Sequence, residues 1–200
     1  MIGSCKILGA ASLLAIGMAS TFAPMESVRA AQDERPLYKD ASAPVEARID
    51  DLIGRMSLDE KIAQITTVWE SKTQIFDDHL QLDPARLAAR YPNGLGHFTR
   101  PSDAKGAVSP RVARGRDPRQ TVALVNALQK WAMTQTRLGI PILFHEEGLH
   151  GYAAVGATSF PQSIALASSW DPHLVQQVNS VIAREIRVRG VPMVLSPVVD

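Results

Sequence analysis

The feature that most constrains the fold is a sequence pattern that occurs twice in the second half of the chain: a predicted helix, a glycine and a short apolar strand. The first copy begins at Asp117-Pro118, runs as an amphipathic helix to Gly139 and continues into the apolar stretch 140–144. The second copy begins at Asp171-Pro172 and ends in the apolar stretch 191–195. Asp is a favoured N-cap, Pro suits the first helical position, and Gly commonly follows the last turn of a helix. Both copies therefore predict a helix followed by a short buried strand.

Helices that alternate with short apolar strands predict a parallel sheet covered by helices. The two copies lie too far apart, and match too loosely, to be repeats of a solenoid. Each strand runs into polar residues, His145-Glu146-Glu147 after the first and 196–200 after the second. In (β/α)₈ barrels this end of the strands carries the active site, and a closed barrel takes about 250 residues. We therefore predict an α/β fold that is the N-terminal portion of an incomplete (β/α)₈ TIM-type barrel in this 200-residue chain.

The first half of the chain is predicted to begin with two helices. One apolar stripe at helical spacing runs from Val45 to Met56, and Ser57 with Glu60 forms a capping box that starts a second short helix through Ile65. A short helix is expected at 84–89 and a strand-like segment at 93–98. Long loops are often functional, so we expect the loop 99–116 to lie over a site or against another domain.

The first thirty residues predict a cleaved signal peptide. Lys6 precedes an uncharged apolar stretch at 7–23, and 28–30 (VRA) offers small residues at the positions that a signal peptidase reads. The alternative is a membrane anchor, but the stretch falls slightly short of the about 20 apolar residues of a span. We therefore expect a signal peptide at 1–30, a polar leader at 31–43 and the barrel portion at 44–200, with a periplasmic or secreted location.

Composition excludes several classes of partner. The formal net charge is +1, so nothing indicates a nucleic-acid or membrane surface, and no membrane association is expected after signal cleavage. The single cysteine, Cys5, precedes the apolar stretch, which argues against a lipid anchor there and leaves the mature chain without thiols. A chain without cysteine suits an oxidising compartment.

The densest polar cluster is the segment 145–151 (HEEGLHG). A zinc-protease helix needs two histidines four residues apart on one helical face, whereas His145 and His150 are separated by Gly148 and follow a strand. We expect no metal site, and for both histidines a structural role in the loop is favoured over direct catalysis. Two glutamates, Glu146 and Glu147, at the mouth of a buried strand are poorly explained by packing and indicate a functional role.

Four segments of the chain resemble the N-terminal barrel domain of family 3 glycoside hydrolases, the family of β-glucosidases and β-xylosidases. The segments are VEARIDDLIGRMSLDEKIAQI, GIPILFHEEGLHG, GATSFPQSIALASSWDP and AREIRVRGVPMVLSPVVD. The resemblance covers about residues 36–200 except 70–116. It implies that Glu147, three residues before His150, binds hydroxyl groups of the sugar, with His150 and Glu146 as secondary candidates for substrate binding. Glu in place of the Asp of many β-glucosidases favours pentosides.

The resemblance also implies the chemistry. An exported enzyme of this family removes non-reducing-end β-linked glucosyl or xylosyl units by retaining double displacement, with two carboxyl groups about 5 Å apart. In the family the nucleophile is an Asp on a later strand, and the acid usually lies in the following domain. We therefore assign no catalytic residue within this chain, expect these residues alone to be inactive, and expect no cofactor. Asp200 is interpreted as a structural residue or as one that supports the site without contacting the substrate, and not as catalytic. The partners would be an oligosaccharide or glycoside and the C-terminal domains of the same full-length chain.

Two alternatives remain open. A catalytically inactive sugar-binding or interaction module on the same barrel differs from an enzyme only by lacking the downstream Asp. A doubly wound exported binding protein would share the alternation of strands and helices. It would not explain Glu146-Glu147 or the order of the motifs.

Overall fold

The computed structural model describes residues 36–104 and 115–197. The expected signal peptide, most of the loop 99–116 and Asp200 lie outside these residues. The chain divides into two compact units, 1–51 and 52–200. The first unit contains a short 3₁₀ helix, η1 (Leu37–Lys39), inside the expected leader, and most of α2 (Val45–Arg55). Among the described helices, none has the length and apolar character that crossing a membrane requires.

The second unit alternates helices and short strands. In chain order its elements after α2 are α3 (Leu58–Gln64), β1 (Thr67–Val68), η2 (Glu70–Ile75), α4 (Pro84–Arg90), β2 (His97–Thr99), α5 (Pro118–Gln135), β3 (Leu143–Glu147), α6 (Ser163–Ala167), α7 (Pro172–Arg187) and β4 (Met193–Leu195).

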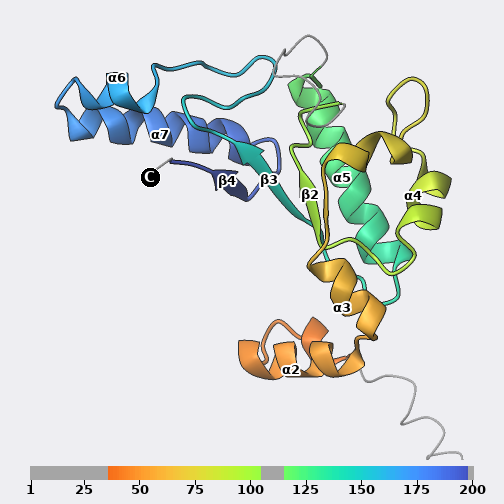
Figure 1. Ribbon diagram of the computed structural model, residues 1–200. Coiled ribbons are helices and arrows are strands. Elements are labelled where there is room, and N and C mark those ends of the chain that lie inside the picture. The colour runs from red at the N-terminus through yellow and green to blue at the C-terminus, as the bar shows by residue number, and fades with distance from the viewer. Residues whose placement is uncertain (1–35, 105–114, 198–200) are drawn as a thin grey trace, which may run out of the picture. The chain divides into compact units, whose positions relative to one another are not determined.

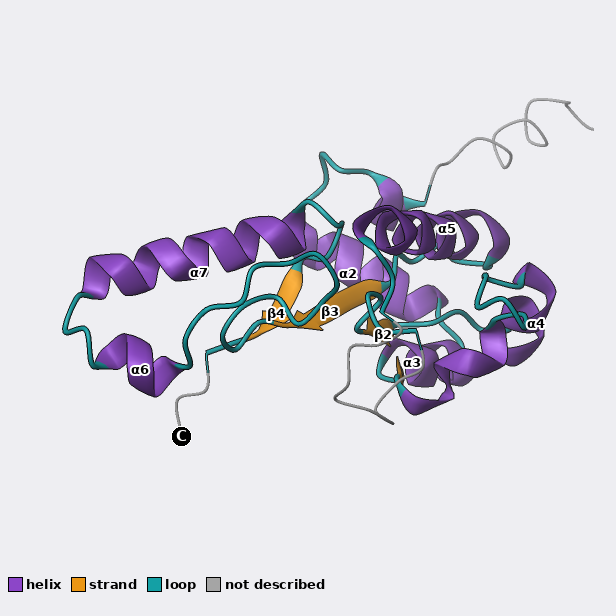
Figure 2. Cartoon of the chain, turned by 90° about the horizontal axis from the view of Figure 1, so that it is seen from above, coloured by secondary structure: helices purple, strands orange, loops and turns teal. Residues whose placement is uncertain are grey.

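The four strands form one parallel sheet in the order β1-β2-β3-β4. Each strand pairs with its neighbour in sequence. Helix α5 connects β2 to β3, and α7 connects β3 to β4; both helices lie on the same side of the sheet (Figures 1 and 2). This is the succession of strands that winds around a (β/α)₈ barrel, in contrast to a doubly wound sheet, whose strand order reverses. The parallel α/β fold that was predicted from the repeated helix–glycine–strand pattern is confirmed.

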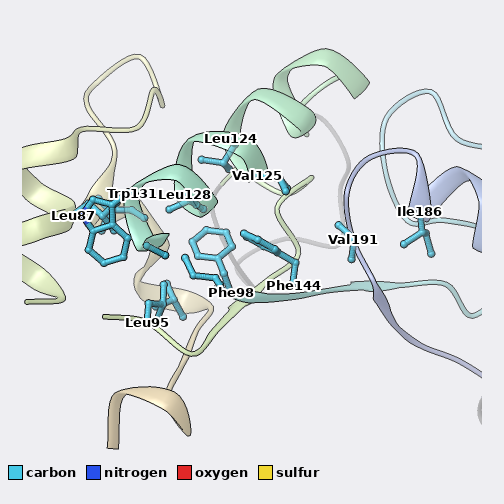
Figure 3. Packing of buried hydrophobic residues seen from close by; sticks show 14 of the residues in the cluster. Leu87, Leu95, Phe98, Leu124, Val125, Leu128, Trp131, Phe144, Ile186 and Val191 are labelled. Carbon is cyan, nitrogen blue, oxygen red and sulfur yellow. The ribbon is translucent and has the colours of Figure 1, made fainter. Parts of the chain in front are cut away.

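The core lies between the sheet and the helices. Phe98 of β2 and Phe144 of β3 are fully buried, and Leu124 and Leu128 of α5 pack over them (Figure 3). The two rings are 6.1 Å apart and tilted by 60°. Burial of large apolar side chains contributes roughly 1.5–3 kcal/mol each, so this layer fixes α5 on the sheet.

Local signals placed the helix starts correctly. Ser57 and Glu60 form the predicted capping box before α3, and Asp117 and Gln120 form another before α5. Asp171 caps α7 by accepting from the backbone N–H groups of residues 173 and 174. These side chains satisfy backbone donors that have no partner within the helix.

The strands are placed differently from the prediction. The sequence predicts a strand at 140–144 followed by polar residues, but β3 runs from Leu143 to Glu147 and contains His145 and Glu146. Backbone pairing with β2 on one side and β4 on the other extends the strand through these polar residues. The helical spacing of Leu174 and Val181 also predicts that both side chains are buried, but in α7 they remain 39% and 36% exposed.

Candidate active site

The sheet has two chemically different faces. Phe98, Phe144 and Val194 point towards the helices and pack in or against the core. Because strand side chains alternate and paired residues of a parallel sheet share a face, the other face is formed by the intervening positions. We call it the inner face; its residues are Thr67, His97, Thr99, Leu143, His145, Glu147, Met193 and Leu195.

Glu147 is the last residue of β3 and lies at the carboxyl end of the inner face. Its side chain is half-buried, and within the described residues its carboxylate has no hydrogen bond or ion pair. Its backbone carbonyl accepts a hydrogen bond of 3.0 Å from the N–H of Ala153, which folds the following loop back onto the strand end. An unoccupied carboxylate on a fixed backbone can accept hydrogen bonds from hydroxyl groups of a ligand.

Glu146 has the opposite environment. It faces the helices and is 0% exposed. Its carboxylate accepts hydrogen bonds from Ser102 N at 2.8 Å, from Ser102 Oγ at 3.0 Å and from Tyr152 Oη at 3.1 Å. Burial raises the pKa of Glu146, and the three hydrogen bonds counteract that rise. The side chain joins the loop after β2 to the loop after β3, and no part of it is exposed to a ligand.

His150 lies in the loop after β3 and is exposed, with no side-chain hydrogen bond among the described residues. Its backbone carbonyl accepts from Phe160 N at 2.8 Å. Gly151 follows with φ of 123°, and a Cβ atom there would lie 2.3 Å from the carbonyl oxygen of Thr158. The motif therefore makes a tight loop in which His150 remains available beside the end of β3.

The inner face carries a pair of histidines that the sequence alone does not indicate. Nδ1 of His145 and Nε2 of His97 are 2.7 Å apart, and burial lowers the pKa of both rings, that of His145 to about 4. The partners are far apart in the chain, and only the register of β2 against β3 brings them together. The pair could be predicted if the register were known. Each histidine is adjacent in its strand to a buried phenylalanine, so both histidines lie on the opposite face of the sheet from the phenylalanines.

Two basic residues fix the loop after β2. Lys72, 0% exposed, donates to the carbonyl oxygens of Thr99, Arg100 and Asp103 at 3.0, 2.9 and 3.3 Å, and its Nζ lies 3.8 Å from a carboxylate oxygen of Asp103. Burial lowers the pKa of Lys72 to about 8. Arg100 donates its backbone N–H to His145 O at 2.8 Å and adopts φ of 45° at the strand end. The carboxyl end of β2 is thus held rigidly beside that of β3.

The described residues contain no cluster of three His, Cys, Asp or Glu side chains that could hold a metal. A cavity of about 550 Å³ lies beside α5, lined among others by Leu80, Arg116 and Leu124. Glu147 does not line it. Since substrate sites of parallel barrels lie at the carboxyl ends of the strands, we assign the candidate site to Glu147 and not to this cavity.

The N-terminal domain of glycosyl hydrolase family 3 matches residues 57–200 of the chain. The chain belongs to glycoside hydrolase family 3. It is 31% identical over 166 residues to a putative β-xylosidase of Formosa agariphila, covering 82% of this chain and 20% of that protein. It is 32% identical over 177 residues to β-glucosidase C of Emericella nidulans, covering 84% and 26%. A periplasmic β-glucosidase/β-xylosidase of Dickeya chrysanthemi is 28% identical over 179 residues, covering 82% and 25%.

The fold comparison agrees with the family. A solved β-glucosidase from Erythrobacter marinus superposes with a TM-score of 0.62 at 31% identity, covering 84% of this chain and 20% of that one. The chain thus spans a fifth to about a quarter of the length of these relatives. The parallel sheet is therefore part of the family 3 barrel domain, as the resemblance implied.

Within this family 3 domain, Gly148, the residue after Glu147, packs closely against β4 and α7. A Cβ atom at Gly148 would lie 2.7 Å from Val194 Cγ2, 3.1 Å from Ile182 Cγ2 and 3.3 Å from Ile186 Cδ1. We expect Gly148→Ala to destabilise the domain by about 1–3 kcal/mol, as overpacked cores generally do. The measurement is the urea midpoint of the purified full-length protein. Gly54→Ala on α2 is the matched control, because a Cβ there meets nothing within 4 Å and should stabilise slightly. Equal effects of the two substitutions would contradict the packing argument.

Proposed function

We propose that this protein is an exported glycoside hydrolase that removes non-reducing-end β-linked xylosyl or glucosyl units by retaining double displacement. Glu147 binds hydroxyl groups of the sugar, and the nucleophile and the acid lie outside residues 1–200. The observation that carries the proposal is the different environment of two adjacent glutamates. The carboxylate of Glu147 is free on the inner face at the carboxyl end of β3, whereas that of Glu146 is saturated on the other face.

Geometry supports the role of Glu147. A half-buried carboxylate accepts stronger hydrogen bonds than a neutral group would, and its strand and the loop ending at Ala153 hold its backbone in place. The names of the relatives support the substrate class, since they include β-xylosidases and β-glucosidases. Export is supported by the signal-like residues 1–30 and by a relative that is named periplasmic.

In the full-length natural protein, Glu147→Gln should lower kcat/KM for aryl β-glycosides by about tenfold to a hundredfold. The amide keeps the size of the side chain but loses the charge, and a hydrogen bond to a charged group contributes roughly 1.5–3 kcal/mol. The measurement is steady-state hydrolysis of aryl β-xyloside and aryl β-glucoside. Glu46→Gln, an exposed residue on α2, is the control and should leave both rates unchanged. If Glu147→Gln also had no effect, Glu147 would not belong to the sugar subsite.

A further inference from the structure

The inner face is polar below Glu147. Barrel interiors are usually filled by branched apolar side chains, yet β1, β2 and β3 place two threonines and two histidines there, while β4 places Met193 and Leu195. Thr67 and Thr99 satisfy each other through their hydroxyl groups, which are 3.0 Å apart. The two histidines pair through one nitrogen each, so their other ring nitrogens are not accounted for by this pairing. Packing therefore does not explain why histidines occupy these positions.

His145 is engaged on one side of its ring only. Its Nδ1 faces Nε2 of His97 at 2.7 Å, and the ring centroids are 4.6 Å apart. Its Nε2 has no partner among the described residues, and it is not one of their fully buried unpartnered atoms, which include Arg100 Nε and Arg189 Nη1. His145 as a whole is 7% exposed. One polar edge of the ring is therefore held by protein, whereas the opposite nitrogen has no protein partner among the described residues.

The position of this atom relates it to the sugar site. His145 lies two residues before Glu147 on the same strand and the same face, so their Cα atoms are about 7 Å apart. The groups around the ring that carry or gain positive charge are His97, Arg100 and Lys72, and they all disfavour the imidazolium form, as does burial. A neutral imidazole offers either a donor or an acceptor at Nε2, according to its tautomer, and a hydroxyl group can complement both.

We propose that His145 is a second sugar-binding residue of the subsite formed by Glu147, that it offers Nε2 to a sugar hydroxyl deeper in the barrel, and that His97 is a positioning residue that fixes the ring through Nδ1. This inference rests on the proposed function, because it assigns a further contact to the same sugar. It also gives the substrate chemistry, a monosaccharide unit with a hydroxyl group directed down the inner face.

Two substitutions of His145 separate substrate contact from packing in the full-length protein. An Asn side chain places a polar atom near Nδ1 and so keeps the partner of His97, but it lacks the outer nitrogen. A Gln side chain reaches the position of Nε2 but loses the contact with His97. We expect His145→Asn to lower kcat/KM by about threefold to tenfold with a melting temperature near that of the wild type. We expect His145→Gln to lower kcat/KM less than His145→Asn does, while it lowers the melting temperature more.

A purely structural histidine pair gives the reverse result, in which activity follows stability and His145→Gln is the more damaged variant. That result, or equal kcat/KM for wild type and His145→Asn, overturns the inference. His97→Asn should lower kcat/KM, but it should add little when combined with His145→Asn, because His97 acts through that ring; additive losses would remove its positioning role. Hydrolysis by the wild type tests the proposed function separately. If the wild type were inactive, calorimetric titration of the same variants with xylose and glucose would decide the contact.

Discussion

Residues 31–200 expressed alone are expected to hydrolyse neither aryl β-xylosides nor aryl β-glucosides above the rate of buffer. Retaining hydrolysis needs two carboxyl groups about 5 Å apart. Within the described residues, Glu147 is free on the inner face, but Glu146 faces the helices and Asp103 pairs with Lys72. The proposed function places both catalytic groups outside these residues, so the acceleration that enzymes provide, at least about a millionfold, is expected to be lost. The full-length protein, assayed in parallel, provides the reference rate.

The folding state of these residues has to be measured beside their activity. Leu143, Met193 and Leu195 expose 45%, 38% and 40% of their area on the inner face, and β4 forms one edge of the described sheet. Exposed strand edges pair with other chains, so the isolated residues are expected to aggregate. Co-expression with the rest of the natural chain as a second polypeptide should restore both solubility and hydrolysis. Turnover by residues 31–200 alone that Glu147→Gln abolishes would show that the chemistry lies within them.

The sequence predicted those features of the fold that depend on neighbouring residues. The capping pairs at Ser57 and Asp117 were predictable because the side chain and the backbone groups that it binds lie within one helical turn. The two-residue strand β1 was not, because so short a segment has no pattern of its own and exists by pairing with β2. The bounds of β3 were shifted for the same reason, since its polar end is held by β4.

The candidate site was predictable in its residue types and not in its contacts. Alternation along a strand implies that Glu146 and Glu147 face opposite sides. It does not say which side is the core, nor that Ser102 and Tyr152 supply the donors that bury Glu146. From the sequence, His145 is interpreted as a structural loop residue, and its contact with His97 could not be predicted because His97 belongs to another strand. Contacts between strands depend on register, which a single sequence does not give.

In the full-length protein, Glu146→Ala is expected to destabilise the barrel domain by about 3–5 kcal/mol, whereas Glu147→Ala should change its stability by less than about 1 kcal/mol. Removing Glu146 leaves three buried donors without an acceptor: the backbone N–H and hydroxyl of Ser102 and the hydroxyl of Tyr152. Each unsatisfied buried group costs about 1–3 kcal/mol. Truncation of Glu147 removes no hydrogen bond or ion pair with protein, because its carboxylate makes none among the described residues.

Intermediate variants keep this prediction measurable if Glu146→Ala does not fold. Tyr152→Phe and Ser102→Ala each remove one donor, and each should cost about 1 kcal/mol. Glu146→Gln should cost no more than these, because its amide oxygen can still accept from Ser102 N and Tyr152 Oη, while its amide nitrogen faces Ser102 Oγ, a hydroxyl that can accept. Burial raises the pKa of Tyr152, which keeps its hydroxyl a donor, and Arg189 lies 4.6 Å above its ring. Tyr152→Phe keeps that ring and its cation–π contact, so it isolates the hydrogen bond.

The stability of each variant is measured as the urea midpoint, followed by tryptophan fluorescence. The activity of each variant is measured as kcat/KM at a temperature where all of them are folded. The loss in stability should be largest for Glu146→Ala, smaller for Glu146→Gln and the two single-donor variants, and smallest for Glu147→Ala. The order of loss in kcat/KM should put Glu147→Ala first, because only its carboxylate is open to a sugar. An activity loss in Glu146→Gln as large as that in Glu147→Gln, without a loss of stability, would place Glu146 in contact with substrate and contradict the division between the two faces of β3.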